Sequence, residues 1–331
     1  MTYSAGGLIQ ATDYNGFVST TAGANVNATW STGATTSGWG QTALGTVSAG
    51  GTVTATQWAQ LVNTLASMGS QTGTTITSRS APTAGQTITA LAAVNTDLTN
   101  CYNNRGNAVA SGTAYGTFTG TTSKTTATGS GATGWTITFT HTVTFPSADQ
   151  ARYFWNAGGI VKVQYGKSST GTDIDPDWNT FAGYCGSINI TGRAQTIAAQ
   201  AYTGTTRLGG TGGTQTTLAT ATGWYALTPG AAATNLFQLN NSNAPYTGEY
   251  ILTTAAVNAG STVLTLTTTW VQPTVSGAGK SCNISGGTAV ASPATTIGAA
   301  TAPTTLVTYL PPSTTYLSAS WGTPTIAASV A

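Results

Sequence analysis

Three aspartates at alternate positions, Asp173, Asp175 and Asp177, form the most concentrated negative patch in the sequence. Carboxylates with this spacing resemble the start of a calcium-binding loop, which continues with glycine at its sixth position and glutamate at its twelfth. Trp178 and Tyr184 hold those positions here. We therefore expect a turn with solvated carboxylates, and the three aspartates are the only candidates for metal ligands that the sequence offers.

Other side chains used in catalysis and metal binding are sparse. His141 is the only histidine, and it shares the apolar face of an alternating segment with Phe139. We expect a hydrogen-bonded histidine of the core or of a sheet edge. Cys101, Cys185 and Cys282 lie far apart and lack the CxxC spacing of zinc sites and redox motifs, so we expect reduced, buried thiols.

Enzymatic chemistry finds little support in these residue types. A glycosidase needs two carboxyl groups around the bond that it cleaves, and Glu249 is the only glutamate. A single histidine on an apolar face does not suggest a Ser-His-Asp arrangement. We expect a chain that is not an enzyme and that binds no cofactor, with a polysaccharide depolymerase as the last alternative.

Charge is the unusual feature of the composition. Nine Lys or Arg and seven Asp or Glu make up 5% of the 331 residues, against about 25% in ordinary globular proteins. A net charge of +2 gives no basic surface for nucleic acid, and no apolar run is long enough for membrane insertion. Hydroxyl and amide groups, which lose water more cheaply than ions, indicate a chain that works within an assembly.

The few charges are unevenly distributed. No charged residue occurs between Tyr14 and Ser78, whereas residues 149–193 hold eight. We expect the neutral N- and C-terminal portions to form most contacts between subunits. The charged middle is expected to face water or to make a few specific bridges.

The first 110 residues predict short helices joined by polar loops. Apolar residues recur at helical spacing, and Thr54 or Thr56 is suited to cap the longest helix. The predicted helices are Asp13–Val18, Val53–Met68 and Ile88–Tyr102. We assign residues 1–110 to a helical and loop region that docks the chain.

After about Tyr115 the apolar residues alternate with polar ones, which predicts strands. A helix over Ser147–Asn156, capped by Ser147, interrupts them. The predicted strands are Tyr115–Thr121, Trp135–Phe145, Gly159–Tyr165, Ser187–Thr191, Trp224–Thr228, Asn235–Leu239, Glu249–Ala255, Ser261–Val271 and Thr304–Tyr309.

These elements predict a mainly β protein with a small α-helical N-terminal region. We expect a mixed β domain at residues 111–192 and an antiparallel, β-sandwich or jelly-roll-like domain at residues 193–331. The proline-containing C-terminal piece is expected to run extended over a neighbour.

Five segments together resemble a known group of proteins. They are Gly7–Asn15, Gly38–Gln41, Val53–Leu61, Asn103–Gly106 and Phe145–Gly159, the last of which contains the run Ala-Arg-Tyr-Phe-Trp-Asn-Ala-Gly-Gly. In order and spacing they are similar to virion structural proteins of tailed bacteriophages, notably the tail-fibre or tail-appendage proteins of T4-like phages of aquatic bacteria. The resemblance covers about residues 5–190.

The resemblance implies a virion protein that is assembled in the host cytoplasm. Its expected partners are further copies of itself, with a trimer as one option, and other virion proteins. We expect a tail or baseplate-associated fibre component. A capsid decoration or neck protein is one alternative. A receptor- or glycan-binding module is another, with exposed rings among Trp224, Tyr225, Tyr246, Trp270 and Trp321 stacking on host surface sugars.

Aromatic and arginine residues of the first 155 positions are the candidates for assembly contacts, because large rings and guanidinium groups dominate interfaces. They are Trp39, Trp58, Arg105, Arg152, Tyr153, Phe154 and Trp155. Arg105 and Arg152 are rare cations in a neutral chain. We expect them to pair with Asp97 and Asp149, or with another subunit.

Overall fold

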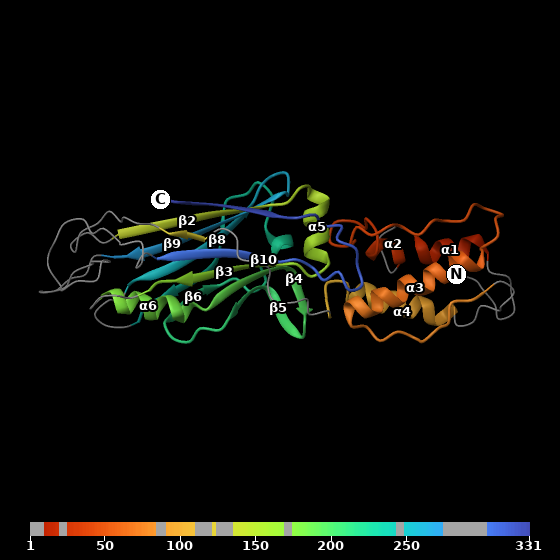
Figure 1. Cartoon of the computed structure of the whole chain (residues 1–331), viewed down its shortest axis with the longest axis horizontal. Helices are drawn as coiled ribbons and strands as arrows, with labels where there is room; N and C mark the ends of the chain where they lie inside the picture. Colours follow the sequence, from red (N-terminus) through yellow and green to blue (C-terminus); the bar gives the residue numbers. More distant parts are fainter. Residues whose placement is uncertain are drawn as a thin grey trace, which may run out of the picture.

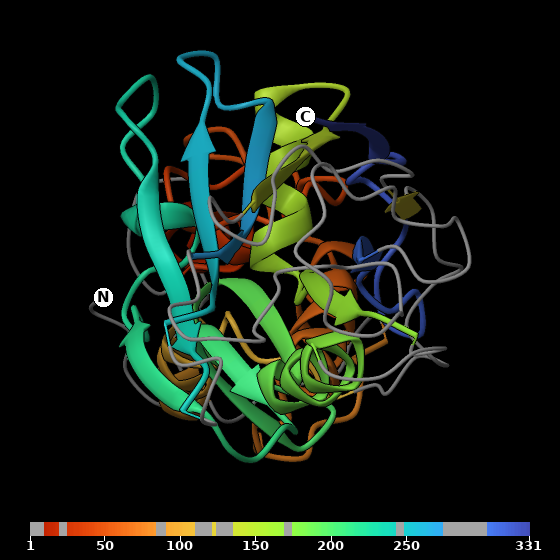
Figure 2. The same cartoon turned by 90° about the vertical axis from the view of Figure 1, so that its left-hand side faces the viewer.

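The computed structural model describes residues 10–19, 25–83, 91–109, 121–123, 135–168, 174–242, 248–273 and 303–331. Helices α1–α4 lie at one end of an elongated molecule and two antiparallel sheets lie at the other (Figure 1). Figure 2 looks along the long axis from the sheet end, with the N-terminal helices behind the sheets. The expected class, mainly β with a helical N-terminal region, is confirmed.

The helical end contains α1 (Ala11–Val18), α2 (Val26–Thr29), α3 (Ala55–Thr72) and α4 (Leu91–Asn103). The N-cap of α3 is Thr54, whose hydroxyl accepts a hydrogen bond from the Gln57 N–H while the Gln57 side chain accepts from the Thr54 N–H. The helix ends at Gly73 with a φ of 70°, which favours glycine. The predicted helix and one of its two predicted caps are confirmed, whereas the four-residue α2 is too short to show a period.

The two sheets are built entirely from antiparallel neighbours. The first sheet has the order β1-β10-β3-β4-β5, and the second has the order β11-β2-β9-β8-β7-β6. The strands are β1 (Thr121–Ser123), β2 (Trp135–Thr144), β3 (Ile160–Gly166), β4 (Ser187–Ile197), β5 (Gln200–Leu208), β6 (Thr214–Leu218), β7 (Thr234–Asn240), β8 (Tyr250–Val257), β9 (Val263–Gln272), β10 (Thr304–Leu310) and β11 (Thr325–Val330).

Each sheet combines strands from the central and the C-terminal parts of the chain. In the first sheet β10 lies between β1 and β3, and in the second sheet β9 and β11 flank β2. The expected boundary between residues 192 and 193 falls inside β4. The described strands therefore form one two-sheet unit in place of two consecutive domains, because hydrogen-bonded pairing joins segments that are distant in sequence.

Aromatic side chains fill the space between the sheets. Tyr165 of β3 packs against Phe237 of β7 and Trp270 of β9, with ring centroids 6.0 and 6.4 Å apart. The Trp270 indole also donates a hydrogen bond to the Thr305 hydroxyl on β10, at 3.1 Å. His141 is buried in β2, as its apolar face predicted. These contacts explain why β8 and β9 alternate strictly between buried and partly exposed residues.

Two helices close the ends of the sandwich. α5 (Ala148–Asn156) begins at Ser147, whose hydroxyl accepts from the Gln150 N–H, so the predicted cap is confirmed. α6 (Ile174–Cys185) packs against β3, and its Trp178 ring lies 5.5 Å from the Trp270 ring. The turn expected across the aspartates is therefore wrong from Ile174 onward, because an apolar helical face anchors this segment to the core.

Two further expectations need correction, and a third falls mostly on residues that the structure does not describe. The expected strand Trp224–Thr228 is wrong: the segment holds a 3₁₀ helix, η1 (Trp224–Ala226), and no strand, and the Trp224 ring stacks on Trp155 at 5.4 Å. The C-terminal piece returns to its own chain, where β11 pairs with β2, in place of a neighbour. Most of the expected strand Tyr115–Thr121 lies outside the described residues.

The α3 cap gives a first test. Thr54→Ala removes the acceptor for the Gln57 N–H and is expected to lower the free energy of unfolding by about 1 kcal/mol. Thr56→Ala changes an exposed threonine two positions further on, without loss of a cap, and is expected to be neutral or slightly stabilising. Urea unfolding followed by circular dichroism measures both. Equal effects of the two changes would contradict the role of Thr54.

Candidate functional site

Three of the five segments that carry the resemblance meet where the helices join the sheets. The Trp39 indole N–H lies 3.2 Å from the Arg105 carbonyl oxygen and 3.1 Å from the Asn156 carbonyl oxygen. Trp39 has no exposed surface. One buried indole therefore connects the loop after α2, the end of α4 and the end of α5.

The Asn156 side chain extends this junction in three directions. Its amide nitrogen donates to the Gly38 carbonyl oxygen at 3.1 Å, and its amide oxygen accepts from Arg193 at 2.5 Å and from the Tyr225 hydroxyl at 2.8 Å. Arg193 also donates to the Thr36 carbonyl oxygen at 2.6 Å. Because Asn156 is fully buried, these bonds carry a structural role that the sequence did not single out.

The two expected arginine pairings have different outcomes. Arg152 lies 2.9 Å from the Asp149 carboxylate, as expected. Arg105 instead donates to the Tyr102 carbonyl oxygen at 2.7 Å and stacks over the Tyr102 ring. Asp97 pairs with Arg79, at 2.5 Å. The Arg105–Asp97 pairing is therefore wrong, since a different arginine occupies that carboxylate.

The aromatic candidates for assembly contacts lie inside this chain. Trp58 and Trp155 are 2% and 0% exposed, and Phe154 is fully buried. Phe154 and Trp155 contact each other and Phe145, with ring centroids 5.0 to 5.8 Å apart. Tyr153 is also buried, at 8%. Side chains with so little exposed surface stabilise their own fold and offer almost nothing to a second subunit.

The rings considered for sugar stacking are mostly in the core as well. Trp224, Trp270 and Trp321 are 6%, 0% and 2% exposed. Tyr225 uses its hydroxyl at the junction, and Tyr246 lies outside the described residues.

Asp177, one of the three candidate metal ligands, is half-buried beside the buried carboxyl group of Glu249. The Asn241 amide nitrogen lies 2.5 Å from an Asp177 oxygen and 2.7 Å from a Glu249 oxygen. Glu249 has no exposed surface, and burial, with the nearby charge of Asp177, raises its pKa to about 9 while the Asn241 hydrogen bond opposes the shift. Burial therefore favours the protonated form of Glu249.

No third metal-ligand side chain joins this cluster within the residues that the structure describes, where no group of three or more His, Cys, Asp or Glu is close enough to hold a metal ion. Asp173 lies outside those residues, and Asp175 lies in α6. Cys101 and Cys185 are buried free thiols, and burial raises the pKa of both. Cys282 lies outside the described part.

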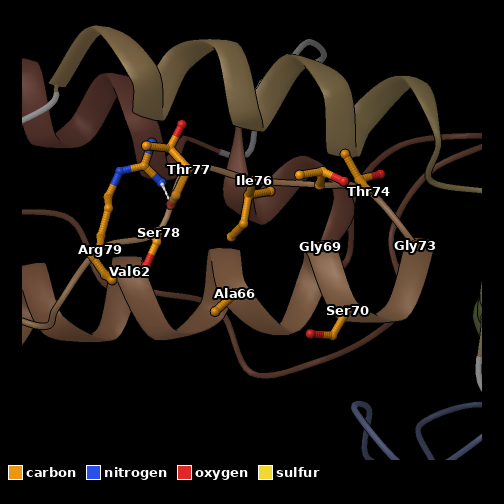
Figure 3. Close-up of a pocket in the computed structure, with 11 residues that line it drawn as sticks. Val62, Ala66, Gly69, Ser70, Gly73, Thr74, Ile76, Thr77, Ser78 and Arg79 are labelled. Atoms are coloured by element: carbon orange, nitrogen blue, oxygen red, sulfur yellow. Dashed lines mark hydrogen bonds between the residues drawn. The ribbon is translucent and has the colours of Figure 1, made fainter.

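The surface of the helical end carries an open groove of about 420 Å³ beside α3 (Figure 3). One wall is α3, through Val62, Ala66, Gly69, Ser70 and Gly73, and the other is the extended segment Thr74–Arg79, which we call the 74–79 segment. Neither wall carries a carboxylate, and Arg79 is the only charged residue of the lining.

Contacts at both ends hold the 74–79 segment in place. The Thr74 N–H donates to the Gly69 carbonyl oxygen at 2.9 Å, and the Thr77 N–H donates to the Asp97 carboxylate at 3.0 Å. The Arg79–Asp97 ion pair adds to the second anchor. Ile76 lies so close to α3 that a Cβ at Gly69 would be 3.0 Å from its side chain. The sequence analysis missed this segment because a short extended stretch with polar ends has no clear period.

The exposed side of α3 forms an uncharged ridge next to this groove. Its exposed residues recur every three or four positions: Thr56, Gln60, Asn63, Ala66 and Ser70. A second groove, of about 290 Å³, lies where Gln60 and Asn63 meet Trp30 and residues 42–45. We call the ridge with its two grooves the α3 face.

No protein-family model, curated protein or solved structure matches this chain. Among the described helices, none combines the length and apolar character that a bilayer crossing requires.

The junction is tested by Asn156→Ala. The change leaves the buried Arg193 and Tyr225 donors without their acceptor, so the free energy of unfolding is expected to fall by about 3 kcal/mol. Asn63→Ala, at an exposed position of α3, is the matched control and is expected to change it by less than about 0.5 kcal/mol. Chemical denaturation compares the two. A loss at Asn156 no larger than the control would contradict the network.

Glu249 predicts a pH dependence of stability. Its pKa is higher in the folded state than the ordinary value, so the folded chain binds more protons, and stability falls as pH rises from about 4.5 toward about 9. Glu249→Gln is uncharged in both states and is expected to flatten this decline, which has a limiting slope of about 1.4 kcal/mol per pH unit. Unfolding midpoints measured between pH 5 and 8 provide the readout.

The control for this experiment is Asp149→Asn, which neutralises a carboxylate that is 68% exposed. It is expected to leave the pH profile parallel to that of the unchanged chain. A profile of Glu249→Gln that also stays parallel would contradict a buried, protonated Glu249.

Proposed function

We propose that this chain is a non-enzymatic structural protein of a tailed-phage particle, a tail or baseplate-associated fibre component that assembles by packing of subunits. The observation that carries the proposal is the α3 face, which carries no charge apart from Arg79, itself paired with Asp97, and whose remaining residues lie in the stretch from Tyr14 to Ser78 that has no charged residue. The five segments that resemble virion proteins of tailed phages support the same role.

The physical basis is the cost of bringing surfaces together. Proteins that stay apart in solution ordinarily rely on surface charge for mutual repulsion. Hydroxyl and amide groups lack that repulsion and lose water more cheaply than ions. Short side chains such as Thr, Ser and Ala also lose little rotamer freedom at a contact. A surface of this kind favours durable packing against a neighbour.

The arrangement of the molecule supports a division of roles. The helical end and the sheet end lie at opposite ends of the long axis (Figure 1). In the proposed fibre component, the helical end docks through the α3 face and the sheet end projects. A capsid decoration or neck protein would use the same surface chemistry and is an outcome of the test below. No contact in the described residues specifically favours a glycan-binding module.

The test is the position of the chain in purified particles of a phage that encodes it. Immunogold labelling with antibodies against the chain, together with mass spectrometry of the particles, is expected to place it at the tail or baseplate. Label on the capsid lattice would overturn the fibre assignment, and absence from particles would overturn the virion role. Release of reducing sugar ends from host polysaccharide by the purified chain would overturn the non-enzymatic role.

A further inference from the structure

The junction between the helices and the sheets carries more positive than negative charge. The Arg193 guanidinium lies over the Tyr225 ring at 5.3 Å, and the Tyr225 hydroxyl donates to the Arg152 carbonyl oxygen at 3.3 Å. Burial lowers the pKa of Arg193, and the charge of Arg105 adds to this effect. Asp149 pairs with Arg152, whereas neither Arg105 nor Arg193 has a carboxylate within ion-pair distance among the described residues. Two neighbouring guanidinium groups therefore lack a compensating charge.

The carboxyl groups whose contacts the structure describes have other partners. These partners are the Gln10 N–H for Asp13, Arg79 for Asp97, Arg152 for Asp149, and the Asn241 amide for Asp177 and Glu249. Asp175 belongs to α6, which lies at the far end of the sheets from the junction (Figure 1). Removing a charge from water without a partner is costly, so the two arginines favour an anion from elsewhere.

Unpaired hydrogen-bonding groups gather beside Gly106, the residue after Arg105. A Cβ at Gly106 would be 3.4 Å from the Arg193 Nε and 3.4 Å from the Gln195 Oε1. Gln195 is 6% exposed, and neither polar atom of its side chain has a partner among the described residues. The Nε atoms of Arg105 and Arg193 are buried and equally without a partner there. Because buried polar groups are nearly always hydrogen-bonded, these atoms require a ligand or an ordered water molecule.

The charge of these groups decides between the two. A water molecule would satisfy the hydrogen bonds and leave both guanidinium charges uncompensated. A carboxylate or phosphate group supplies the negative charge, and its oxygens match the planar N–H donors of arginine in charge-assisted hydrogen bonds. The Gln195 amide nitrogen adds a further N–H donor. The chemistry of the donor set therefore selects an oxyanion.

We propose that Arg105, Arg193 and Gln195 form an oxyanion site beside Gly106, which takes a carboxylate or phosphate group from outside the chain. Both arginines are half-buried and Asn104 and Ala194 beside them are exposed, so the group enters from solvent. A free phosphate ion and an acidic side chain of a neighbouring protein present similar oxygens, and the experiments below separate them. The inference is independent of the proposed function, because the site belongs to the isolated chain.

Isothermal titration calorimetry of the full chain tests the charge of the site. Inorganic phosphate and acetate are titrated separately, in a chloride buffer of constant ionic strength, and one oxyanion is expected to bind per chain. Arg105→Gln removes one guanidinium group and is expected to weaken phosphate binding about tenfold or more. Arg207→Gln removes the same charge at the end of α6, where Arg207 donates to the Tyr184 carbonyl oxygen, and is expected to leave binding unchanged.

Gly106→Ala tests the space without a change in charge. Its Cβ would lie 3.4 Å from the Arg193 Nε and the Gln195 Oε1, a distance that the fold tolerates, in the position of the oxyanion. Phosphate binding is expected to weaken about tenfold or more. Gly45→Ala is the matched control, because a Cβ there meets nothing within 4 Å, and it is expected to bind as the unchanged chain does. Circular dichroism melting confirms that each variant is folded.

Nuclear magnetic resonance of the arginine Nε–H groups provides an independent readout on the unchanged chain. The signals of Arg105 and Arg193 are expected to shift as phosphate is added. The signal of Arg207, whose Nε donates to the Cys185 carbonyl oxygen, is expected to stay in place.

The two probes also separate the sources of the oxyanion. Binding of acetate at least as tight as that of phosphate would support an acidic side chain of a neighbouring protein, and a clear preference for phosphate would support the free ion. Absence of saturable binding for both probes, or binding that ignores Arg105→Gln and Gly106→Ala, would overturn the site.

Discussion

A buried indole and a buried amide hold the two ends of this molecule together. Trp39 and Asn156 satisfy backbone carbonyl groups of the loop after α2, the end of α4 and the end of α5, in a place with no access to water. Unsatisfied carbonyl and guanidinium groups there would be costly, so the position of the helices relative to the sheets depends on this network.

The scarcity of charged residues affects both the interior of the fold and the molecular surface. With few ions available, buried polar groups find uncharged partners, as in the bond between the Trp270 indole and the Thr305 hydroxyl across the two sheets. The large aromatic rings pack in the core, as the buried Trp39 and Trp155 show. What remains on the exposed ridge of α3 is a set of small or amide side chains without charge. The composition therefore links the interior of the fold to the proposed role in assembly.

Prediction from sequence worked where one local signal acted alone. The α3 cap at Thr54 and the alternation of β8 and β9 follow from short-range hydrogen bonding and from a half-buried sheet face. It failed at β5 and β6, whose threonine-rich sequences have no apolar alternation. It also failed at Trp224, where stacking on Trp155 overrides strand propensity. The Glu249 cluster could not be foreseen, because it joins Asp177 to Asn241 and Glu249, which are distant in sequence.

By itself, the amino-acid sequence determined the class of the protein, the longer helices, several central strands and an uncharged surface, since these depend on local periodicity and composition. The tertiary structure alone decided that β10 and β11 return to the central strands. It also decided that Arg79, and not Arg105, pairs with Asp97. These features depend on which distant segments meet, and no local pattern encodes that choice.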